Sequence, residues 1–388
     1  FVVDTIAKML ASETRQRRRR PHDQENFQRQ ATALISDLSH DVLGDGLGRY
    51  FRRSHRAYEG LTRYHPPFLS KKVSDVVDTM VTSGLVRQKL GENKEGEKIA
   101  TLITPTEAFA EAVKQRGLTF SDFRRAKNQE TITLRKRPPD MWTKGELLDY
   151  EDTEKTHRYR EEMRIINEAL AKADLGFDHP LYPSAAVDTS DRFLSRRFNG
   201  SFEQGGRLFG GYWQPLPKEI RKQGLRIDGE PVAVLDFGQM AVRLAYGLAG
   251  TEPPQGDAYL IEPYGQAYRE GFKTLISAML FSDKALTKKP KGTKELLPKT
   301  KVKTLCEAVV KTHSPIAHAF NIGLGLSLMY KESEVMVAIL LTLIHSGITA
   351  LPIHDALAVS VSNVERAYRV MHDTFVQEVG INPIIKTE

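Results

Sequence analysis

The chain has 388 residues, 40% of them hydrophobic, which is enough to build two or three domains with cores of their own. Lys and Arg number 56 against 49 Asp and Glu, and the formal charge of +7 suits a polyanionic partner. A single cysteine, Cys306, excludes a disulfide framework, and no apolar run is long enough to cross a membrane. We therefore expect a cytoplasmic protein without a membrane partner, while the missing initial Met leaves room for an upstream organelle-targeting segment.

Residues 1–22 are expected to form a basic N-terminal arm. The first 13 residues have the spacing of a short amphipathic helix, and arginines follow at 15 and at 17–20, before Pro21. Such a cluster cannot bury itself, so it is either a solvated tail or a segment that contacts phosphates.

Residues 23–127 have the pattern of a winged helix-turn-helix, a domain that often binds nucleic acid. Helices are expected at 24–38 and 69–84, with a basic segment at 51–65 between them. Two strands at 85–90 and 99–103 then enclose a charged tip that has the shape of a wing.

Outward side chains of this domain would meet the DNA backbone or groove. The expected contacts are Lys71, Lys72, Ser74, Arg87 and Lys89. Winged helices also serve as protein–protein modules, and this alternative stays open.

Residues 128–180 are expected to be a linker followed by a charged helical segment. Residues 143–174 form either a reduced thumb that grips a duplex or a connecting helix. A proofreading exonuclease needs a hydrophobic strand that carries Asp-x-Glu. Here Asp152 and Glu154 lie in a charged helical stretch instead, so we expect no exonuclease.

A carboxylate, Asp236, ends a predicted strand within residues 181–254. Residues 231–235 form an apolar run too short for a helix, Gly238 would allow a turn, and residues 241–248 favour a helix. Because an unpaired buried carboxylate is costly, we expect Asp236 to face a crevice as a metal ligand or general base. A helix N-cap is the alternative interpretation. Upstream, residues 192–209 alternate arginines with phenylalanines, which suits contact with a nucleic-acid backbone.

A predicted helix within residues 255–330 places two cations and an aromatic ring on one face. Its members, which recur every fourth residue, are Arg269, Lys273, Ser277 and Phe281. Such a face can hold a triphosphate at one end and a base or sugar at the other, although an ordinary amphipathic surface helix has the same spacing.

His354 and Asp355 lie within residues 331–388 at the tip of a predicted β-hairpin. Apolar runs flank the pair, and Leu357, Val359 and Val361 alternate as in a half-buried strand. Alone, this pair is as well explained by a hydrogen-bonded turn.

The order of four segments resembles the palm and fingers of family A DNA polymerases and of the related single-subunit RNA polymerases. The segments are GGRLFGGYWQPLPKEIR, LDFGQMAVRL, REGFKTLISAMLFS and LPIHDALAV, and the resemblance covers about the last half of the chain. It implies an α+β right-hand fold with an antiparallel palm sheet at 181–254 and 331–388 and helical fingers at 255–330, joined here to the winged-helix-like domain.

The resemblance also implies roles for individual residues. Asp236 and Asp355 would be the catalytic acids and would bind two Mg²⁺ ions, with Mn²⁺ as a substitute. The nucleotide would contact Arg269, Lys273, Ser277, Phe281 and Ala241. The primer-template would contact Arg207, Gln214, Arg243 and His354.

Three departures from the family pattern concern the choice of sugar. The glutamate that acts as a steric gate against the ribose 2′-hydroxyl is replaced by Ala241, and the tyrosine that ends the fingers helix by Phe281. The glutamate that often follows His-Asp is replaced by Ala356, which brings the chain nearer to the RNA polymerase branch. We therefore expect weak exclusion of ribonucleotides.

The sequence thus predicts a template-directed nucleotidyltransferase, a DNA polymerase that extends a primer 3′ end by two-metal phosphoryl transfer. Its partners would be a DNA primer-template and nucleoside triphosphates, with RNA as a further partner, in a nucleoid, phage or plasmid setting. An RNA polymerase or primase-like enzyme is one alternative. A non-catalytic DNA-binding protein with a relic palm is the other.

Overall fold

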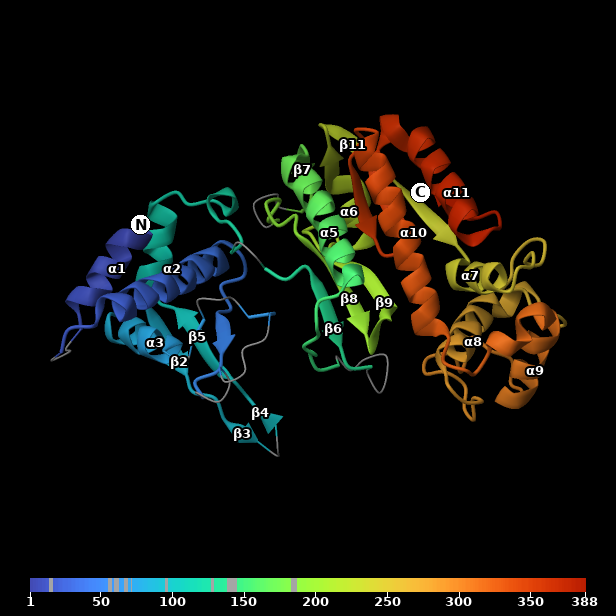
Figure 1. The fold of residues 1–388 in the computed structure, drawn as a ribbon, viewed down its shortest axis with the longest axis horizontal. Coiled ribbons are helices and arrows are strands. Elements are labelled where there is room, and N and C mark those ends of the chain that lie inside the picture. The colour runs from blue at the N-terminus through green and yellow to red at the C-terminus, as the bar shows by residue number, and fades with distance from the viewer. Residues whose placement is uncertain are drawn as a thin grey trace. The chain divides into compact units, whose positions relative to one another are not determined.

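The structure is a computed structural model with both helices and strands, and its parts are labelled in Figure 1. It describes residues 1–13, 17–54, 58, 63–65, 69–70, 72–94, 97–126, 129–137, 145–182 and 187–388. The chain divides into two units. The first is Phe1–Glu130 with Pro180–Asp191, and the second is Thr131–His179 with Arg192–Glu388.

The first unit combines helices with small antiparallel sheets. Its helices are α1 (Val2–Ala11), α2 (Pro21–Leu43), α3 (Val73–Thr82), α4 (Glu107–Gln115) and the short 3₁₀ helix η2 (Phe120–Asp122). Its strands are β1 (Arg49–Phe51), β2 (Val86–Lys89), β3 (Asn93–Lys94), β4 (Glu97–Lys98) and β5 (Thr101–Pro105). One sheet has the order β1-β5-β2, and β3 pairs with β4 alone.

The core of this unit forms where the sequence places its apolar stripes. Ile35 and Leu38 of α2 are buried with Val76, Val77 and Met80 of α3, so the apolar sides of these two helices face the same core. The predicted strands at 85–90 and 99–103 are present as β2 and β5. Strand β1 was not predicted, because its three residues follow a glycine-rich turn and contain arginine. Seven of the fifteen residues of the predicted basic segment at 51–65 lie outside the described residues.

The second unit contains the longer elements. Its helices are α5 (Glu154–Lys172), α6 (Lys218–Gly224), α7 (Met240–Leu248), α8 (Arg269–Phe281), α9 (Val302–Thr312), α10 (Gly325–His345) and α11 (Val364–Val379), with 3₁₀ helices η4 (Gln266–Tyr268), η5 (Ser314–Ala319) and η6 (Val361–Asn363). Its strands are β6 (Ile132–Arg135), β7 (Leu175–Phe177), β8 (Leu194–Asn199), β9 (Ser201–Gly210), β10 (Leu225–Ile227), β11 (Glu230–Gly238), β12 (Ala350–Ile353), β13 (Ala356–Ser360) and β14 (Ile384–Thr387).

The larger sheet of this unit has the order β12-β13-β11-β10-β7, and β14 also pairs with β11. All of these pairings are antiparallel. Asp228 and Gly229 join β10 to β11 with φ angles of 54° and 76°, as a two-residue hairpin with the right-handed strand twist requires. The sheet brings β11 and β13, more than a hundred residues apart in sequence, into direct hydrogen bonding.

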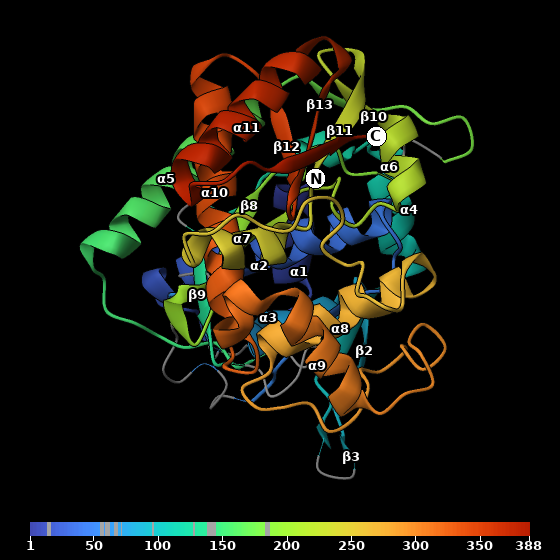
Figure 2. The same ribbon diagram turned by 90° about the vertical axis from the view of Figure 1, so that its right-hand side faces the viewer.

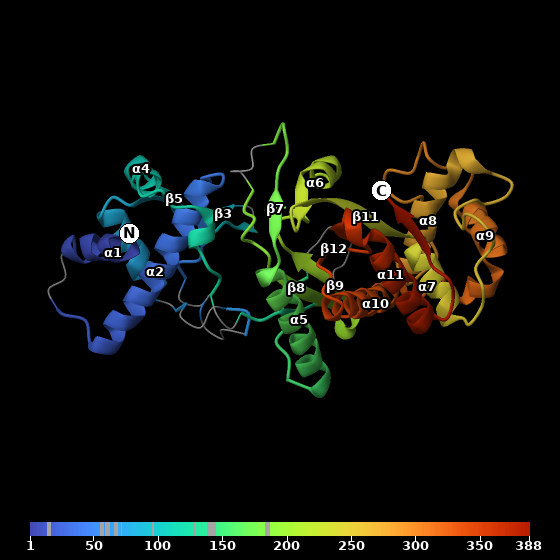
Figure 3. The ribbon, with the colours of Figure 1, turned by 90° about the horizontal axis from the view of Figure 1, so that it is seen from above.

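The smaller sheet, β6-β8-β9, packs one face against helices α5 and α10. Its buried positions alternate along β8, as a half-buried strand requires. Helix α10 also contacts α7 and α11, and Figure 3 shows α10 and α11 side by side. Residues 332–345 are apolar on nearly all sides of the helix, and Val335, Met336, Ile339, Leu340 and Leu343 of α10 are all buried.

The turn after β11 corrects one detail of the sequence analysis. Gly238 was expected to make the turn, but it belongs to the strand, and an added Cβ there would lie 2.9 Å from the Ile384 side chain. The left-handed residue is Gln239, with φ of 60°. Gly238 is therefore required for close strand packing.

In the described part of the chain, the helices are either too short or too polar to cross a bilayer.

Candidate active site

The larger sheet brings Asp236 and Asp355 next to each other. Asp236 of β11 is paired with Ala356 of β13, and Asp355 directly precedes that alanine at the hairpin tip. The Phe237 amide donates to the Asp355 carbonyl at 3.2 Å, which fixes the two backbones together. Both side chains are partly exposed, and we find no hydrogen bond or ion pair to either carboxylate from the described residues. The sheet therefore brings the two predicted acids together, and their role as metal ligands stays a prediction.

The electrostatics show that these carboxylates oppose each other. Burial, together with the negative charges of Asp355 and Glu388, raises the pKa of Asp236 to about 6, against the opposing effect of Lys218 and Lys273. A cation placed between two such acids would relieve this repulsion. The donor set consists of hard oxygens, which Mg²⁺ prefers.

A metal at this place would have few protein ligands. Within the described ranges, no group of three or more His, Cys, Asp or Glu is placed to hold an ion. Glu388, the further acid near Asp236, is paired with Lys218 at 2.6 Å. The two free carboxylates fit a magnesium ion that completes its shell with water and substrate phosphates, which is common for this metal.

His354 occupies the turn before Asp355 in an unusual backbone conformation. Its φ angle is 59°, in the left-handed region, and its ring meets the ring of Phe209 on β9 edge-on at 5.7 Å. Burial by the surrounding protein, then the charge of Arg207, lower the pKa of His354. His354 was predicted to contact the primer-template, and its exposed ring is placed beside the acids.

Helix α8 presents the predicted polar face. Lys273 and Ser277 are exposed on successive turns, and the opposite side is buried through Phe272, Ile276 and Met279. Lys273 acts on the charge of Asp236 electrostatically and lowers its pKa, so this face of α8 and the acids share one electrostatic environment. Figure 2 shows α8 next to α9.

Arg269, at the start of this face, is engaged by carboxylates. Its Nε donates to Asp257 at 2.5 Å, it also pairs with Glu270, and its guanidinium lies 5.2 Å from the centre of the Tyr259 ring. Tyr259 is buried, and burial raises its pKa to about 12. A triphosphate that contacts Arg269 would therefore compete with Asp257.

The sequence analysis missed Asp257 and Tyr259. They lie in an irregular segment between α7 and η4, so no periodicity marked them. Asp257 is held by the Tyr259 amide at 3.0 Å, and Lys386 acts on its charge from β14. The one available signal was their position between Asp236 and Arg269 in sequence.

Arg207 is held by an acid on α10. Its Nε and one terminal nitrogen donate to the two carboxylate oxygens of Glu332 at 2.5 and 2.8 Å, and the pair lies within electrostatic reach of Asp355. The Arg207 side chain is 27% exposed and that of Glu332 is 5% exposed. Glu332 thus fixes the predicted primer-template arginine beside the acids.

Two other residues that were predicted to contact the primer-template form hydrogen bonds within the protein instead. The Gln214 amide donates to the carbonyls of Leu208 and Pro352 and accepts from the Gly210 amide, so all three bonds are internal. Arg243 of α7 is buried and donates to the Asn382 carbonyl at 2.7 Å. The expectation that Arg243 faces nucleic acid is corrected, because the helix turns this side chain inward.

Two predicted nucleotide contacts, Ala241 and Phe281, are half-buried at helix ends. Ala241 is in the first turn of α7, shortly after Asp236. The Phe281 ring packs against the start of α10, where a Cβ added to Gly325 would lie 2.3 Å from it. A side chain at position 325 would clash with the aromatic ring, so glycine is required there.

The arginine-rich region before β11 is divided between two environments. Arg196, on the inner face of β8, is fully buried and pairs with Glu162 and Glu334. Its expected contact with a nucleic-acid backbone is wrong, because strand alternation points it inward. Arg197 lies on the opposite face, across from Arg207, with its guanidinium 4.5 Å from the centre of the Phe209 ring. This outer face keeps the predicted mixture of arginine and phenylalanine.

The first unit contains the residues predicted to contact DNA. Lys71 and Arg15 lie outside the described residues. Ser74 is buried and donates to the Arg53 carbonyl at 3.3 Å, so its expected outward orientation is wrong. Arg87 and Lys89 are exposed along β2, as predicted.

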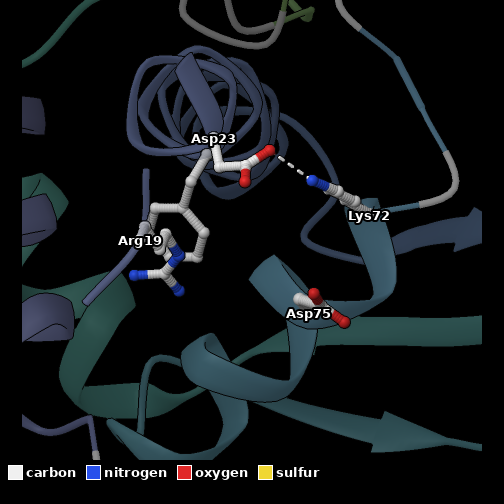
Figure 4. A pocket seen from close by; sticks show the side chains of 5 residues that line it. Arg19, Asp23, Lys72 and Asp75 are labelled. Atoms are coloured by element: carbon white, nitrogen blue, oxygen red, sulfur yellow. Dashed lines mark hydrogen bonds and ion pairs between the residues drawn. The ribbon is translucent and has the colours of Figure 1, made fainter. Parts of the chain in front are cut away.

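Lys72 lines a small hollow at the start of α3. It pairs with Asp23 of α2, and Figure 4 shows this pair facing Arg19 and Asp75 across the hollow. Arg19 in turn pairs with Glu13. Because its charges are largely paired within the protein, the hollow does not have the character of a phosphate site.

Comparisons with known proteins give a likeness in structure but none in sequence. No family model matches the chain, and none of the curated proteins matches its sequence. Its fold is similar to that of the POL domain of Pol1 from M. smegmatis, solved in complex with DNA primer-template and dNTP. The TM-score is 0.34 and the sequence identity 12%, and the match covers 60% of this chain and 50% of that one. The matched region thus spans half the length of that domain's chain.

Proposed function

We propose that this protein is a template-directed nucleotidyltransferase that extends a nucleic-acid primer with nucleoside triphosphates. The observation that carries the proposal is the pairing of β11 with β13, which joins two unpaired carboxylates, Asp236 and Asp355, opposite the cation Lys273. Phosphoryl transfer consists mainly of positioning and charge stabilisation, and this site provides both with few groups.

The roles divide between the two sides of the site. Asp236 and Asp355 hold divalent cations, which supply charge stabilisation for the attacking and leaving oxygens when bound. Lys273, and Arg269 once it leaves Asp257, bind the triphosphate, because ammonium and guanidinium donors match phosphate oxygens. Arg207, held by Glu332, and the exposed His354 ring contact the primer-template near the acids.

We further propose that the enzyme is a DNA polymerase of the family A type without a proofreading exonuclease. Asp152 pairs with Arg160 and Glu154 begins α5, so these acids belong to a helix and its cap and not to a strand. The first unit, with Arg87 and Lys89 exposed on β2, would act as a winged-helix DNA-binding domain. The role of α5 as a thumb stays a prediction.

The principal test is primer extension on a single template. Asp236→Asn should lower incorporation by about 10³-fold or more, because several kcal/mol of metal-mediated stabilisation are lost. Asp283→Asn, at an exposed position after α8, is the matched control and should extend as the wild type does. Unchanged extension by Asp236→Asn would refute the proposal.

An RNA polymerase or primer-synthesising enzyme is the second candidate, and the small residues Ala241 and Ala356 favour it. Comparison of dNTPs with rNTPs separates the two. The DNA polymerase should use dNTPs faster yet incorporate rNTPs at a readily measured rate, and Ala241→Glu should suppress rNTP use. Faster extension with rNTPs than with dNTPs would favour the second candidate.

A further inference from the structure

The positive charge of the protein is concentrated in one segment, residues 284–303, which joins α8 to α9. The segment contains eight lysines and one glutamate, so its net charge of +7 equals that of the entire chain. The other residues therefore balance to zero. The composition alone had suggested a polyanionic partner, and this distribution locates where such a partner would bind.

This lysine segment is built into the fold. Leu297 and Thr293 are buried, and the Leu296 carbonyl lies so close to α8 that a Cβ added to Gly271 would be 1.9 Å from that oxygen. Internal bonds hold the chain, among them Thr293 Oγ1 to the Pro290 carbonyl at 2.7 Å. The lysines are therefore presented on a packed scaffold attached to the back of the candidate phosphate-binding helix.

The lysine side chains face solvent and are not neutralised. Seven of the eight are exposed: Lys284, Lys288, Lys291, Lys294, Lys299, Lys301 and Lys303. The eighth, Lys289, donates to the Pro298 carbonyl at 2.6 Å. Among the described residues, we find no carboxylate within ion-pair distance of any of them, whereas most arginines of this unit are paired.

We propose that the lysine segment is a sequence-independent binding surface for the phosphate backbone of double-stranded nucleic acid. Lysine is a point charge that suits phosphates, and the segment contains no aromatic residue on which the bases of a single strand could stack. A duplex also presents phosphates at about twice the density of a single strand. This inference rests on the proposed function for its choice of nucleic acid among polyanions.

The test compares two variants that lose the same charge at different places. In the first, Lys288, Lys291, Lys294 and Lys299 of the segment are replaced by Gln. In the second, Lys8, Lys114, Lys172 and Lys222, which are exposed on other elements, are replaced by Gln. Binding to a 30-bp duplex and to a 30-nt single strand is measured by fluorescence anisotropy over a range of salt, without nucleotide or divalent ion.

We expect the segment variant to lose about tenfold or more in duplex affinity and its log–log salt slope to fall by about two or more, since each phosphate contact contributes about 0.9. The second variant should stay within about twofold of wild type. A version with Lys→Arg at the four segment positions should retain binding, which controls for altered folding.

Equal losses in both Gln variants, no loss in the segment variant, or a loss confined to the single strand would overturn the proposal. Vesicles of phosphatidylserine and phosphatidylcholine that bind wild type as tightly as the duplex would also overturn it. Because no nucleotide is present, a catalytically inert protein can pass this test and an active polymerase can fail it.

Discussion

At the scale of single residues, the candidate site is distinguished by two carboxylates that have no cationic partner among the described residues. Many carboxylates of the second unit have a cationic partner, for example Glu332 with Arg207 and Glu334 with Arg196. Asp236 and Asp355 have no such partner among the residues that the structure describes, and each faces the other's charge. Such an arrangement costs stability and is commonly kept because a site needs it.

The raised pKa of Asp236 leads to a prediction about stability and pH. Since its pKa rises from 3.8 to about 6 on folding, stability falls as pH rises through this range, and the deficit is constant above it. Asp236→Asn should therefore stabilise the protein by roughly 1 to 3 kcal/mol at pH 8, and this gain should shrink towards pH 4.5. Urea unfolding at both pH values measures the difference, with Asp283→Asn as the control. A variant less stable than wild type at pH 8 would contradict the pKa shift.

The sequence located the acids and the cations but not their internal partners. Asp236, Asp355, Arg269 and Lys273 stand at ends of apolar runs or at helical spacing, which is visible in one dimension. Arg243 and Ser74 are buried because each lies on the side of its helix that packs against neighbouring elements. A single polar residue gives no periodicity from which that side could be predicted. Asp257 reaches Arg269 through an irregular segment that has no sequence pattern at all.

At the scale of elements, the smaller sheet depends on one buried arginine. Arg196 of β8 is fully buried, donates to Ser333 and Glu334 of α10, and pairs with Glu162 of α5. Its guanidinium also lies 4.5 Å from the centre of the Tyr159 ring. This residue therefore fastens the strand to both helices that cover it.

Arg196→Met should lower the free energy of unfolding by roughly 3 to 5 kcal/mol, because Glu162 and Glu334, both partly buried, each lose one of two arginine partners and keep only Arg158. Arg164→Met, on the exposed face of α5, removes ion pairs with Glu161 and Glu168 and should cost much less, because solvent screens exposed pairs. Chemical denaturation measures both. Equal costs for the two variants would show that the buried network contributes little.

Secondary structure was predictable where the hydrophobic period of a segment and its length indicated the same type of element. Helix α8 and the strand pair β2 and β5 follow their hydrophobic spacing closely. The packing of the lysine segment was not predictable, although Leu297 and Thr293 are buried and Leu297 lies against α8. Two small buried side chains among eight lysines are too weak a signal for sequence analysis.

At the scale of the whole molecule, the chain passes between its two units more than once. Residues Pro180–Asp191 belong to the first unit although their sequence neighbours belong to the second. His40 of α2 binds Asp188 at 2.8 Å, and Arg125 pairs with Asp191 at 2.7 Å. The sequence placed these residues at the start of the palm, since long-range pairing of this kind leaves no local pattern.

These ion pairs predict where the chain becomes sensitive to proteases. Burial opposes ionisation of Asp188, but hydrogen bonds from His40 and Ser190 outweigh it and lower its pKa. His40→Ala should therefore release residues 180–191 and increase cleavage there several-fold in limited proteolysis followed by mass spectrometry. His345→Ala, at the exposed end of α10, is the control and should leave the pattern unchanged. An unaltered cleavage rate in His40→Ala would mean that other contacts hold the segment.

The central claim is that Asp236 and Asp355 jointly hold divalent cations, and manganese titration followed by electron paramagnetic resonance tests it most directly. In the presence of a nucleoside triphosphate and a primer-template, wild-type protein should bind Mn²⁺ more tightly than the nucleotide alone does. Asp236→Asn and Asp355→Asn should each weaken this binding by about tenfold or more, because each removes a charged ligand. Wild-type Mn²⁺ affinity in both variants would contradict the account.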